Sequence, residues 1–200
     1  MSGKTEGAAR GAVAFAMCGS FCTFAAAVPQ AARLVQLGWD VLPIMSFAAA
    51  GLDTRFGPAA QWRARLEQAT GRPVMDSLTA VEPLGPKGMA QALVIAPCTG
   101  ATLARLANGL SDTPVTLAAK SLLRTGCPIV LAISTNDGLG ASGESIARLM
   151  QRKNYYFVPY GQDDCRAKPR SLKADMTLIP PTLAAALHGE QLQPILAVGL

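Results

Sequence analysis

Five short apolar runs recur along the chain, and each is followed by a polar or glycine-containing turn and then by a helical pattern. The runs occupy residues 13–17, 41–46, 92–96, 129–133 and 155–158. They show no alternation of apolar and polar side chains, which is typical of parallel strands covered by helices on both faces. Helices are predicted at residues 20–37, 58–70, 99–108, 113–125, 143–152 and 181–188. The pattern predicts an α/β fold, a three-layer domain with a mainly parallel sheet.

The first run allows three interpretations: a signal peptide, a membrane span, or a strand that turns into a helix. Gly19, Ser20 and Thr23 interrupt the run, whereas a spanning helix needs about 20 mostly apolar residues. Beyond Ser20 the apolar residues recur three and four apart, and the pattern ends at Gly38. We therefore expect a strand, a helix with Ser20 as its N-cap, and a cytoplasmic protein without a membrane segment.

Composition indicates one well-buried core, since half of the 200 residues are hydrophobic and only 16% are charged. So few charges also suggest that further surface is covered in an oligomer. We expect a single domain over residues 1–200, with about residues 1–10 as a flexible extension. The Pro- and Gly-rich residues 82–88 are too short to divide two domains, and we expect a surface loop there.

Charge and cysteine usage exclude two classes of function. The net charge is +5, but the basic residues are scattered and do not alternate with aromatic side chains, so no nucleic-acid site is expected. The five cysteines form no CxxC pair and the only histidine is His188, which argues against a structural zinc site. We expect reduced cysteines, most of them in the core, including Cys18 and Cys22. Trp39 and Trp62 are expected in core or subunit contacts.

Gly19 and Ser20 form a turn between the first strand and its helix. Such a turn leaves backbone N–H groups free at the positive end of a helix, where a phosphate can bind, although any such turn can contain a glycine. The chain has no GxGxxG or GxxxxGK[ST] motif, and its second strand ends at Ser46 instead of at an acidic residue. Gly19, Ser20 and Ser46 therefore favour a mononucleotide phosphate over NAD or ATP.

A third motif, "APCTGATLARLANGLSD" at residues 96–112, begins where the third run ends. Thr99 follows Pro97 as the expected cap of a helix, and small residues there allow a flat ring to lie against the backbone. A capped helix after a strand explains the same residues without any ligand.

These three features resemble the flavoprotein superfamily of homo-oligomeric flavin-containing cysteine decarboxylases, which bind FMN between the protomers of a Rossmann-like fold. The resemblance implies FMN as cofactor and a homo-oligomer. It assigns cofactor contacts to Gly19, Ser20 and Ser46 at the phosphate, to Pro97, Thr99 and Thr102 along the ring, and to Ser134.

Five further segments resemble, within that superfamily, the family of dipicolinate synthase B subunits: "TRFG" at 54–57, "EPLGPK" at 82–87, "ISTNDGLG" at 133–140, "YGQDD" at 160–164 and "LQPIL" at 192–196. The resemblance implies an oxidoreductase that converts dihydrodipicolinate to dipicolinate during sporulation. It also implies a partner, the A subunit of dipicolinate synthase, that binds NADP, which agrees with the missing dinucleotide motif.

Three departures argue against cysteine decarboxylation. The decarboxylases use a catalytic histidine that is absent here, their motif has Asn where this chain has Ala101, and Thr135-Asn136 stands where they have Met-Asn. Two alternatives remain open: a stand-alone flavin-dependent decarboxylase or prenyltransferase relative, and a non-catalytic scaffold for the A subunit.

Substrate contacts are predicted on two loops. A planar dicarboxylate needs cationic donors, which Arg55 and Lys87 supply between Gly and Pro residues. Asn136 and Asp137 follow the fourth strand, at the edge where ligands of open α/β sheets bind. Asp137 is either a proton acceptor or part of a turn before Gly138, and both interpretations stay open. Residues 162–164 are expected on a solvated loop, and a role at a substrate or subunit edge is the second interpretation.

Overall fold

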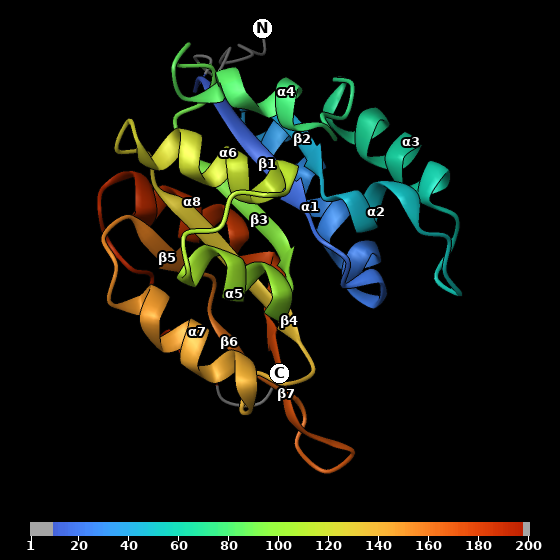
Figure 1. The fold of residues 1–200 in the computed structure, drawn as a ribbon, viewed down its shortest axis with the longest axis vertical. Coiled ribbons are helices and arrows are strands. Elements are labelled where there is room, and N and C mark those ends of the chain that lie inside the picture. The colour runs from blue at the N-terminus through green and yellow to red at the C-terminus, as the bar shows by residue number, and fades with distance from the viewer. Residues whose placement is uncertain (1–9, 198–200) are drawn as a thin grey trace, which may run out of the picture.

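Five parallel strands form the centre of the molecule in the order β2, β1, β3, β4 and β5 (Figure 1). In the computed structural model, which describes residues 10–197, they are β1 (Ala12–Met17), β2 (Asp40–Met45), β3 (Leu93–Cys98), β4 (Ile129–Thr135) and β5 (Tyr155–Phe157). These are the five predicted runs, and the expected α/β fold class is confirmed. Because all five strands run in one direction, their carboxyl ends meet at one edge of the sheet.

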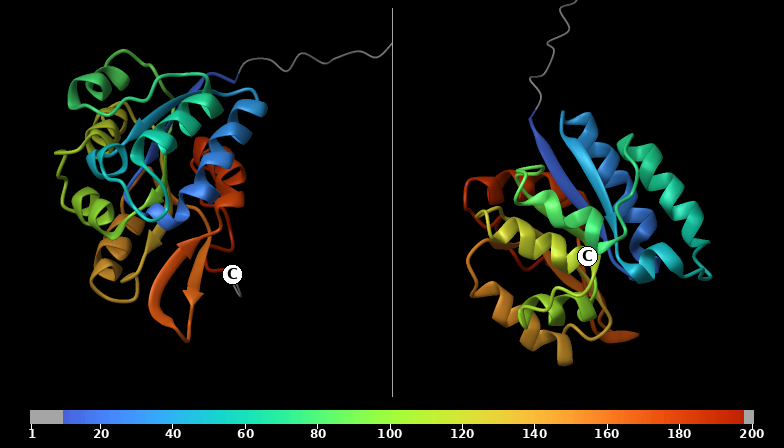
Figure 2. Two further views of the ribbon diagram at one scale, coloured as in Figure 1. Left: turned by 90° about the vertical axis from the view of Figure 1, so that its right-hand side faces the viewer. Right: turned by 45° about the horizontal axis from the view of Figure 1, so that its top comes forward.

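An antiparallel hairpin, β6 (Tyr160–Asp164) and β7 (Lys168–Ala174), extends this edge. The first three residues of β4 pair with β5, whereas its last two, Ser134 and Thr135, pair with Lys173 and Leu172 of β7. The hairpin therefore projects beyond the parallel strands (Figures 1 and 2). The expectation of a loop at 162–164 is wrong because polar side chains occupy both faces of β6, which leaves no apolar pattern to detect.

Helices cover both faces of the sheet. The 3₁₀ turn η1 (Phe21–Thr23) leads into α1 (Phe24–Gln36), which lies on one face with η3 (Met176–Leu178) and α8 (Ile179–Leu187). The other face carries α4 (Leu78–Val81), α5 (Gly100–Ala107), α6 (Pro114–Leu123) and α7 (Ala141–Met150). α2 (Phe47–Gly51) and α3 (Ala59–Thr70) lie beside β2. The six predicted helices are confirmed, whereas α2 and α4 are too short to show a helical period.

The hydrophobic core lies between the sheet and these helices. Every residue of β3 is buried, as are the large side chains Phe15, Phe24 and Phe157. Trp39 and Trp62 are buried too, which confirms their expected place in the core. The Trp62 and Phe24 rings pack edge to face, with ring centroids 5.4 Å apart, and this contact holds α3 against α1.

Residues 82–88 match the expected surface loop only in part, since Pro86, Lys87 and Gly88 are exposed. The first part of the segment is the 3₁₀ turn η2 (Glu82–Leu84), in which Leu84 is fully buried. The next residue, Gly85, donates its backbone N–H to Ser121 Oγ at 2.9 Å, and a Cβ at this glycine would lie 1.9 Å from the carbonyl oxygen of Ser121. The Pro and Gly residues correctly predict a turn, but they do not predict that this turn packs against α6.

No helix within residues 10–197 is long and apolar enough to cross a membrane. The predicted flexible extension over about residues 1–10 lies, except for Arg10, outside the described residues.

Candidate functional site

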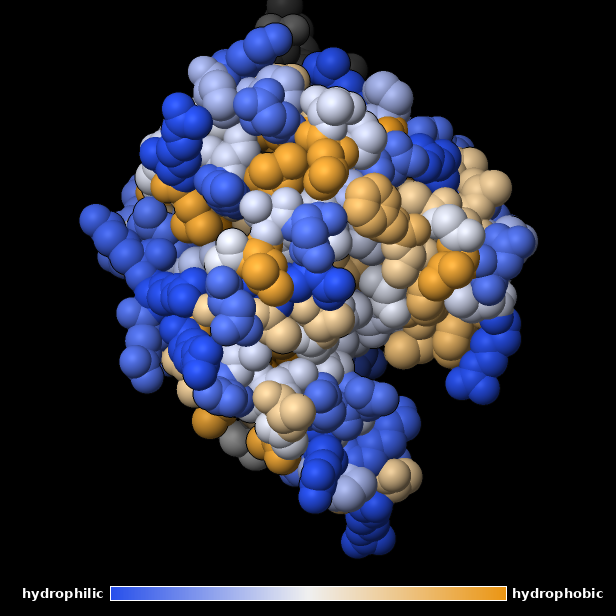
Figure 3. All heavy atoms as spheres, in the orientation of Figure 1, coloured by the Kyte–Doolittle hydropathy of each residue, from blue (hydrophilic) through white to orange (hydrophobic). Residues whose placement is uncertain are grey.

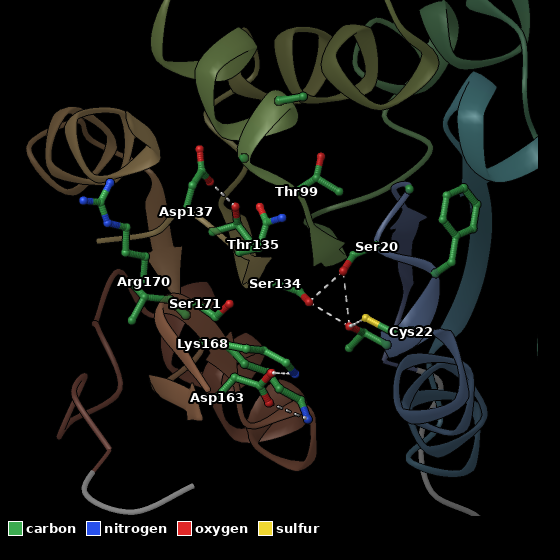
Figure 4. A pocket seen from close by; sticks show the side chains of 18 of the residues that line it. Ser20, Cys22, Thr99, Ser134, Thr135, Asp137, Asp163, Lys168, Arg170 and Ser171 are labelled. Carbon is green, nitrogen blue, oxygen red and sulfur yellow. Dashed lines mark hydrogen bonds and ion pairs between the residues drawn. The ribbon is translucent and has the colours of Figure 1, made fainter. Parts of the chain in front are cut away.

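A cleft of about 1110 Å³ opens at the carboxyl edge of the sheet (Figure 4). The chain passes from β1 to β2 on one side and to β3 on the other, and ligands of open α/β sheets bind at such a reversal of strand order. The lining consists of residues 19–23, 55–56, 99–101, 134–137, 163 and 168–173. The cleft thus combines the β1 turn, the start of α5, the end of β4 and the hairpin.

Three hydroxyl groups meet in this cleft. Ser134 Oγ lies 2.8 Å from Ser20 Oγ and 2.7 Å from Thr23 Oγ1, and the latter two oxygens are 3.3 Å apart. Ser20 precedes η1 as predicted, but its hydroxyl makes no capping hydrogen bond because it faces Ser134 instead. We call these three residues the hydroxyl cluster. Sequence reasoning missed Thr23, because its position in the sequence predicts only a polar residue on a helix.

Free backbone donors adjoin the hydroxyl cluster. The N–H groups of Gly19, Phe21 and Cys22 make no hydrogen bond to any residue that the structure describes. They lie at the positive end of the continuous η1–α1 segment, which attracts anions. Ser46 follows β2 nearby but does not line the cleft, and its Oγ accepts the N–H of Ala49 at 3.2 Å. The hydrogen of that hydroxyl group remains available for donation.

The predicted ring-binding motif lies at the end of β3. Thr99 caps α5 by accepting the N–H of Thr102 at 3.2 Å, as predicted. Thr99, Gly100 and Ala101 line the cleft, whereas Pro97 and Thr102 are buried behind them. The exposed edge of the motif is therefore made of small residues.

Asp137 lies in the turn after β4 and is held by neighbouring hydroxyls. Its Oδ1 accepts hydrogen bonds from Thr135 Oγ1 and from Ser142 Oγ, the second at 2.7 Å. These bonds, first that of Ser142, lower the pKa of the Asp137 carboxyl. A lowered pKa makes a weaker base, which favours the turn interpretation over the proton acceptor. Asn136 beside it is exposed in the cleft, and its side chain makes no hydrogen bond to any described residue.

The two predicted substrate contacts are far apart within this chain. Arg55 lies on the loop between α2 and α3 and lines the cleft, with its guanidinium carbon 4.9 Å from the centre of the Phe56 ring. Lys87 precedes β3 at the opposite, amino edge of the sheet, near Gln91, whose N–H bonds to the carbonyl of Ala12 at the start of β1. The cleft of one chain therefore contains Arg55 but not Lys87.

The hairpin contributes a wall that sequence reasoning missed. Lys168, Arg170, Ser171 and Lys173 of β7 line the cleft opposite the β1 turn. Asp163 of β6 accepts from Lys168 Nζ at 2.7 Å, while Lys173 Nζ lies 3.9 Å from its other oxygen. The only available signal was the density of basic residues after residue 165.

Two of the five cysteines are buried, two are exposed, and Cys127 is half-buried. Burial raises the pKa of Cys18 to about 11 and that of Cys98 well above its ordinary value. Cys22 and Cys165 are exposed, and Cys22 lines the cleft. The expectation that Cys22 is packed in the core is wrong because η1 turns it away from the core. His188 ends α8, and no histidine lines the described cleft.

Comparison with known proteins identifies the family. A family model described as Flavoprotein matches residues 4–156. The B subunit of dipicolinate synthase from Bacillus subtilis strain 168 is 46% identical over 184 residues, which cover 92% of each chain. The chain belongs to the flavoprotein family. The crystal structure of the corresponding B subunit from Bacillus halodurans covers 96% of this flavoprotein and 98% of its own chain, at 44% identity and a TM-score of 0.88.

More distant structures share the fold of this flavoprotein. The FMN-dependent cysteine decarboxylase SpaF is 24% identical, with a TM-score of 0.67 and coverage of 89% of this chain and 98% of its own. The family match ends at residue 156, within β5, so the hairpin lies outside it.

Proposed function

We propose that this flavoprotein is the FMN-binding partner of an NADP-binding protein, the A subunit of dipicolinate synthase, and that the two oxidise dihydrodipicolinate to dipicolinate, which is pyridine-2,6-dicarboxylate. The 46% identity over 92% of the chain to a dipicolinate synthase B subunit carries the proposal. The proposed location of this reaction is the cytoplasm of a sporulating cell. No dinucleotide motif follows β1, which supports binding of NADP by the partner.

The donors of the cleft suit the FMN phosphate. The hydroxyl cluster and the free N–H groups of Gly19, Phe21 and Cys22 are neutral donors at the positive end of α1, and Ser46 can add a further hydroxyl hydrogen. Ala101 leaves room for a flat ring along the start of α5, and the absence of a side chain at Gly100 lets the chain approach Ser142 and Thr135. The residues present therefore fit the group.

The reaction converts a dihydropyridine to a pyridine, so a hydride and a proton leave the substrate. NADP⁺ accepts the hydride and becomes NADPH, and FMN held at the hydroxyl cluster would supply two-electron redox chemistry. Arg55 binds a substrate carboxylate through its planar guanidinium. Asn136 orients the substrate through its free amide group. Asp137 holds the turn that presents Asn136, through the hydrogen bonds that it accepts from Ser142 and Thr135, and the released proton passes to water.

We also infer a homo-oligomer. Phe47, Leu52 and Phe56 are between 40% and 54% exposed on α2 and the loop after it, beside Arg55. Figure 3 shows apolar side chains gathered over this region. A contiguous apolar surface of this kind favours association with a second copy, so sedimentation equilibrium should give a mass above the 20.8 kDa of one chain.

The first experiment is the visible absorption spectrum of the purified chain, with mass spectrometry of the ligand released on denaturation. We expect stoichiometric FMN, and NADP-dependent formation of dipicolinate only when the A subunit is added. Ser20→Ala should weaken the binding of FMN more than that of riboflavin, because only FMN has the phosphate. Ser145→Ala, at a buried serine on α7, is the matched control.

A stand-alone flavin-dependent decarboxylase or prenyltransferase relative is the second candidate, favoured by the likeness of fold to SpaF. It predicts turnover without the A subunit, although no histidine lines the described cleft. The third candidate is a non-catalytic scaffold for the A subunit. It predicts a colourless chain that does not bind added FMN, and a complex that keeps full activity when cleft residues are changed.

A further inference from the structure

Asp137 is packed against the first residue of α5. A Cβ on Gly100 would lie 3.0 Å from Asp137 Oδ1. It would lie closer still to the hydroxyl oxygens of Ser142 and Thr135, which donate to that same Oδ1. Only a glycine therefore lets the carboxylate and its two donors approach the backbone of α5 so closely. Figure 4 shows Asp137 and Thr135 on the side of the cleft that carries Thr99.

The charge of this carboxylate is fixed in place. Asp137 forms no salt bridge with any lysine or arginine that the structure describes. The hydrogen bonds from Ser142 and Thr135 lower its pKa, so the carboxylate is ionised throughout the neutral range. Both donors are themselves anchored, Thr135 by the pairing of β4 with β7 and Ser142 by burial in the first turn of α7. A negative charge is therefore held at the start of α5.

This charge lies beside the proposed place of the flavin ring, which is along the start of α5. The reduction FMN + 2e⁻ + H⁺ → FMNH⁻ leaves one further negative charge on the ring at neutral pH. A fixed carboxylate nearby repels that charge and so stabilises oxidised flavin relative to reduced flavin. Free FMN is a stronger oxidant than NADP⁺, so a flavin that works with NADP⁺ as the final acceptor requires a lowered potential.

We propose that Asp137 lowers the reduction potential of FMN bound in the cleft, and so matches the cofactor to NADP⁺ as the final electron acceptor. This inference rests on the proposed function, which supplies both the flavin and the acceptor. Asp137 acts here through its charge and not as an acid or a base, which agrees with its lowered pKa. Gly100 is the positioning residue that allows the charge to lie so close to α5.

The test is a spectroscopic titration of the FMN-loaded chain with dithionite in the presence of a reference dye, which gives the midpoint potential of the flavin. Asp137→Asn removes the charge and keeps an oxygen that can accept from Ser142 and Thr135. We expect reduced FMN to gain roughly tenfold in affinity relative to oxidised FMN, which raises the potential of a two-electron couple by about 30 mV. Asp137→Ser is a second uncharged variant and should shift the potential in the same direction.

Two controls separate the charge from other effects. Asp112→Asn removes a negative charge that pairs with Arg105 of α5 but lies outside the cleft, and it should leave the potential unchanged. Ser142→Ala removes a donor from the turn and keeps the Asp137 charge, so the potential should not rise. A rise in Ser142→Ala equal to that in Asp137→Asn would assign the effect to the structure of the turn and overturn the inference.

The remaining outcomes distinguish this inference from the proposed function. Bound FMN with an unchanged potential in both uncharged variants of Asp137 overturns the inference and leaves the proposed function standing. An equal rise in Asp112→Asn would assign the effect to net charge and also overturn the inference. A chain that binds no FMN overturns both. A raised potential in Asp137→Asn, with no dipicolinate formed by the wild-type chain and the A subunit, would reject the proposed function and retain this inference.

Discussion

Asp137 should make the stability of the turn after β4 depend on pH. Its pKa is lowered by the hydrogen bonds from Ser142 and Thr135. A carboxyl whose pKa is lower in the folded state stabilises the fold above its unfolded pKa, and that contribution is lost as the pH falls through the folded value. The turn after β4 should therefore be fully held at neutral pH and loosen below the ordinary aspartate pKa of 3.8.

Asp137→Asn should lower the free energy of unfolding by about 1 kcal/mol at pH 7, because a neutral amide accepts more weakly than a carboxylate. The difference from the wild type should shrink as the pH drops below about 4. Denaturant unfolding at pH 7 and pH 3 measures it, and a difference of equal size at both values would contradict the interpretation.

Asp163 contacts both Lys168 and Lys173 in the cleft, so it should compete with an anionic ligand for these lysines. Asp163→Asn should therefore tighten binding of pyridine-2,6-dicarboxylate by up to about fivefold, as expected for the loss of an exposed ion pair. Asp112→Asn, which removes an exposed ion pair with Arg105 outside the cleft, is the control. Weaker binding in the Asp163 variant would show that Asp163 positions the lysines instead.

Thiol reactivity should separate the cysteines. Cys22 and Cys165 are exposed and should react with a thiol reagent at least about tenfold faster than the buried Cys18 and Cys98, whose thiols ionise only at high pH. Added FMN should slow the modification of Cys22 and leave Cys165 unchanged. Peptide mapping of the labelled chain checks both statements, and equal protection of both cysteines would contradict the placement of FMN.

At the scale of elements, the contact between η2 and α6 depends on the absence of a side chain at Gly85. Gly85→Ala should reduce the free energy of unfolding by about 3 kcal/mol, because the new Cβ would overlap the backbone of Ser121. Gly51→Ala is the control, since nothing lies within 4 Å of its Cβ position. Thermal denaturation compares the two variants, and equal melting temperatures would contradict close packing of Gly85 against Ser121.

The parallel part of the sheet was predictable from sequence, whereas the hairpin was not. The runs of β1 and β3 are buried on both faces, so their apolar composition reports their place directly. β6 and β7 are held by pairing with the end of β4, a contact between residues that lie far apart in sequence. Their exposed polar side chains follow no period that sequence reasoning could detect.

The residues of the site divide in the same way, into those marked by a local sequence pattern and those placed by contacts between distant parts of the chain. Gly19, Ser20 and Thr99 were predictable because each stands at a fixed place after a strand. Thr23 and Ser171 were missed, since their place in the cleft depends on how the chain folds and not on their position after a strand. Lys87 stands in a loop of the expected composition, but only the strand direction reveals that this loop opens at the far edge of the sheet.

For the molecule as a whole, FMN should stabilise the fold by mass action. At a hundredfold excess over the dissociation constant, a ligand that binds only the folded state adds about 2.7 kcal/mol. For a domain of this size that corresponds to a rise in melting temperature of about 5–11 °C. Differential scanning calorimetry with FMN and with riboflavin tests it, and equal shifts for both would argue against a phosphate contact.

The hydroxyl cluster should determine how flavin affinity depends on pH. Its three hydroxyls and the neighbouring N–H groups carry no proton that ionises in the neutral range. Each hydroxyl hydrogen can instead rotate, so that oxygens which bond to one another within the cluster can all donate outwards to a phosphate. Affinity should then follow the second ionisation of the phosphate ester, near pH 6, and so report a property of the ligand and not of the protein.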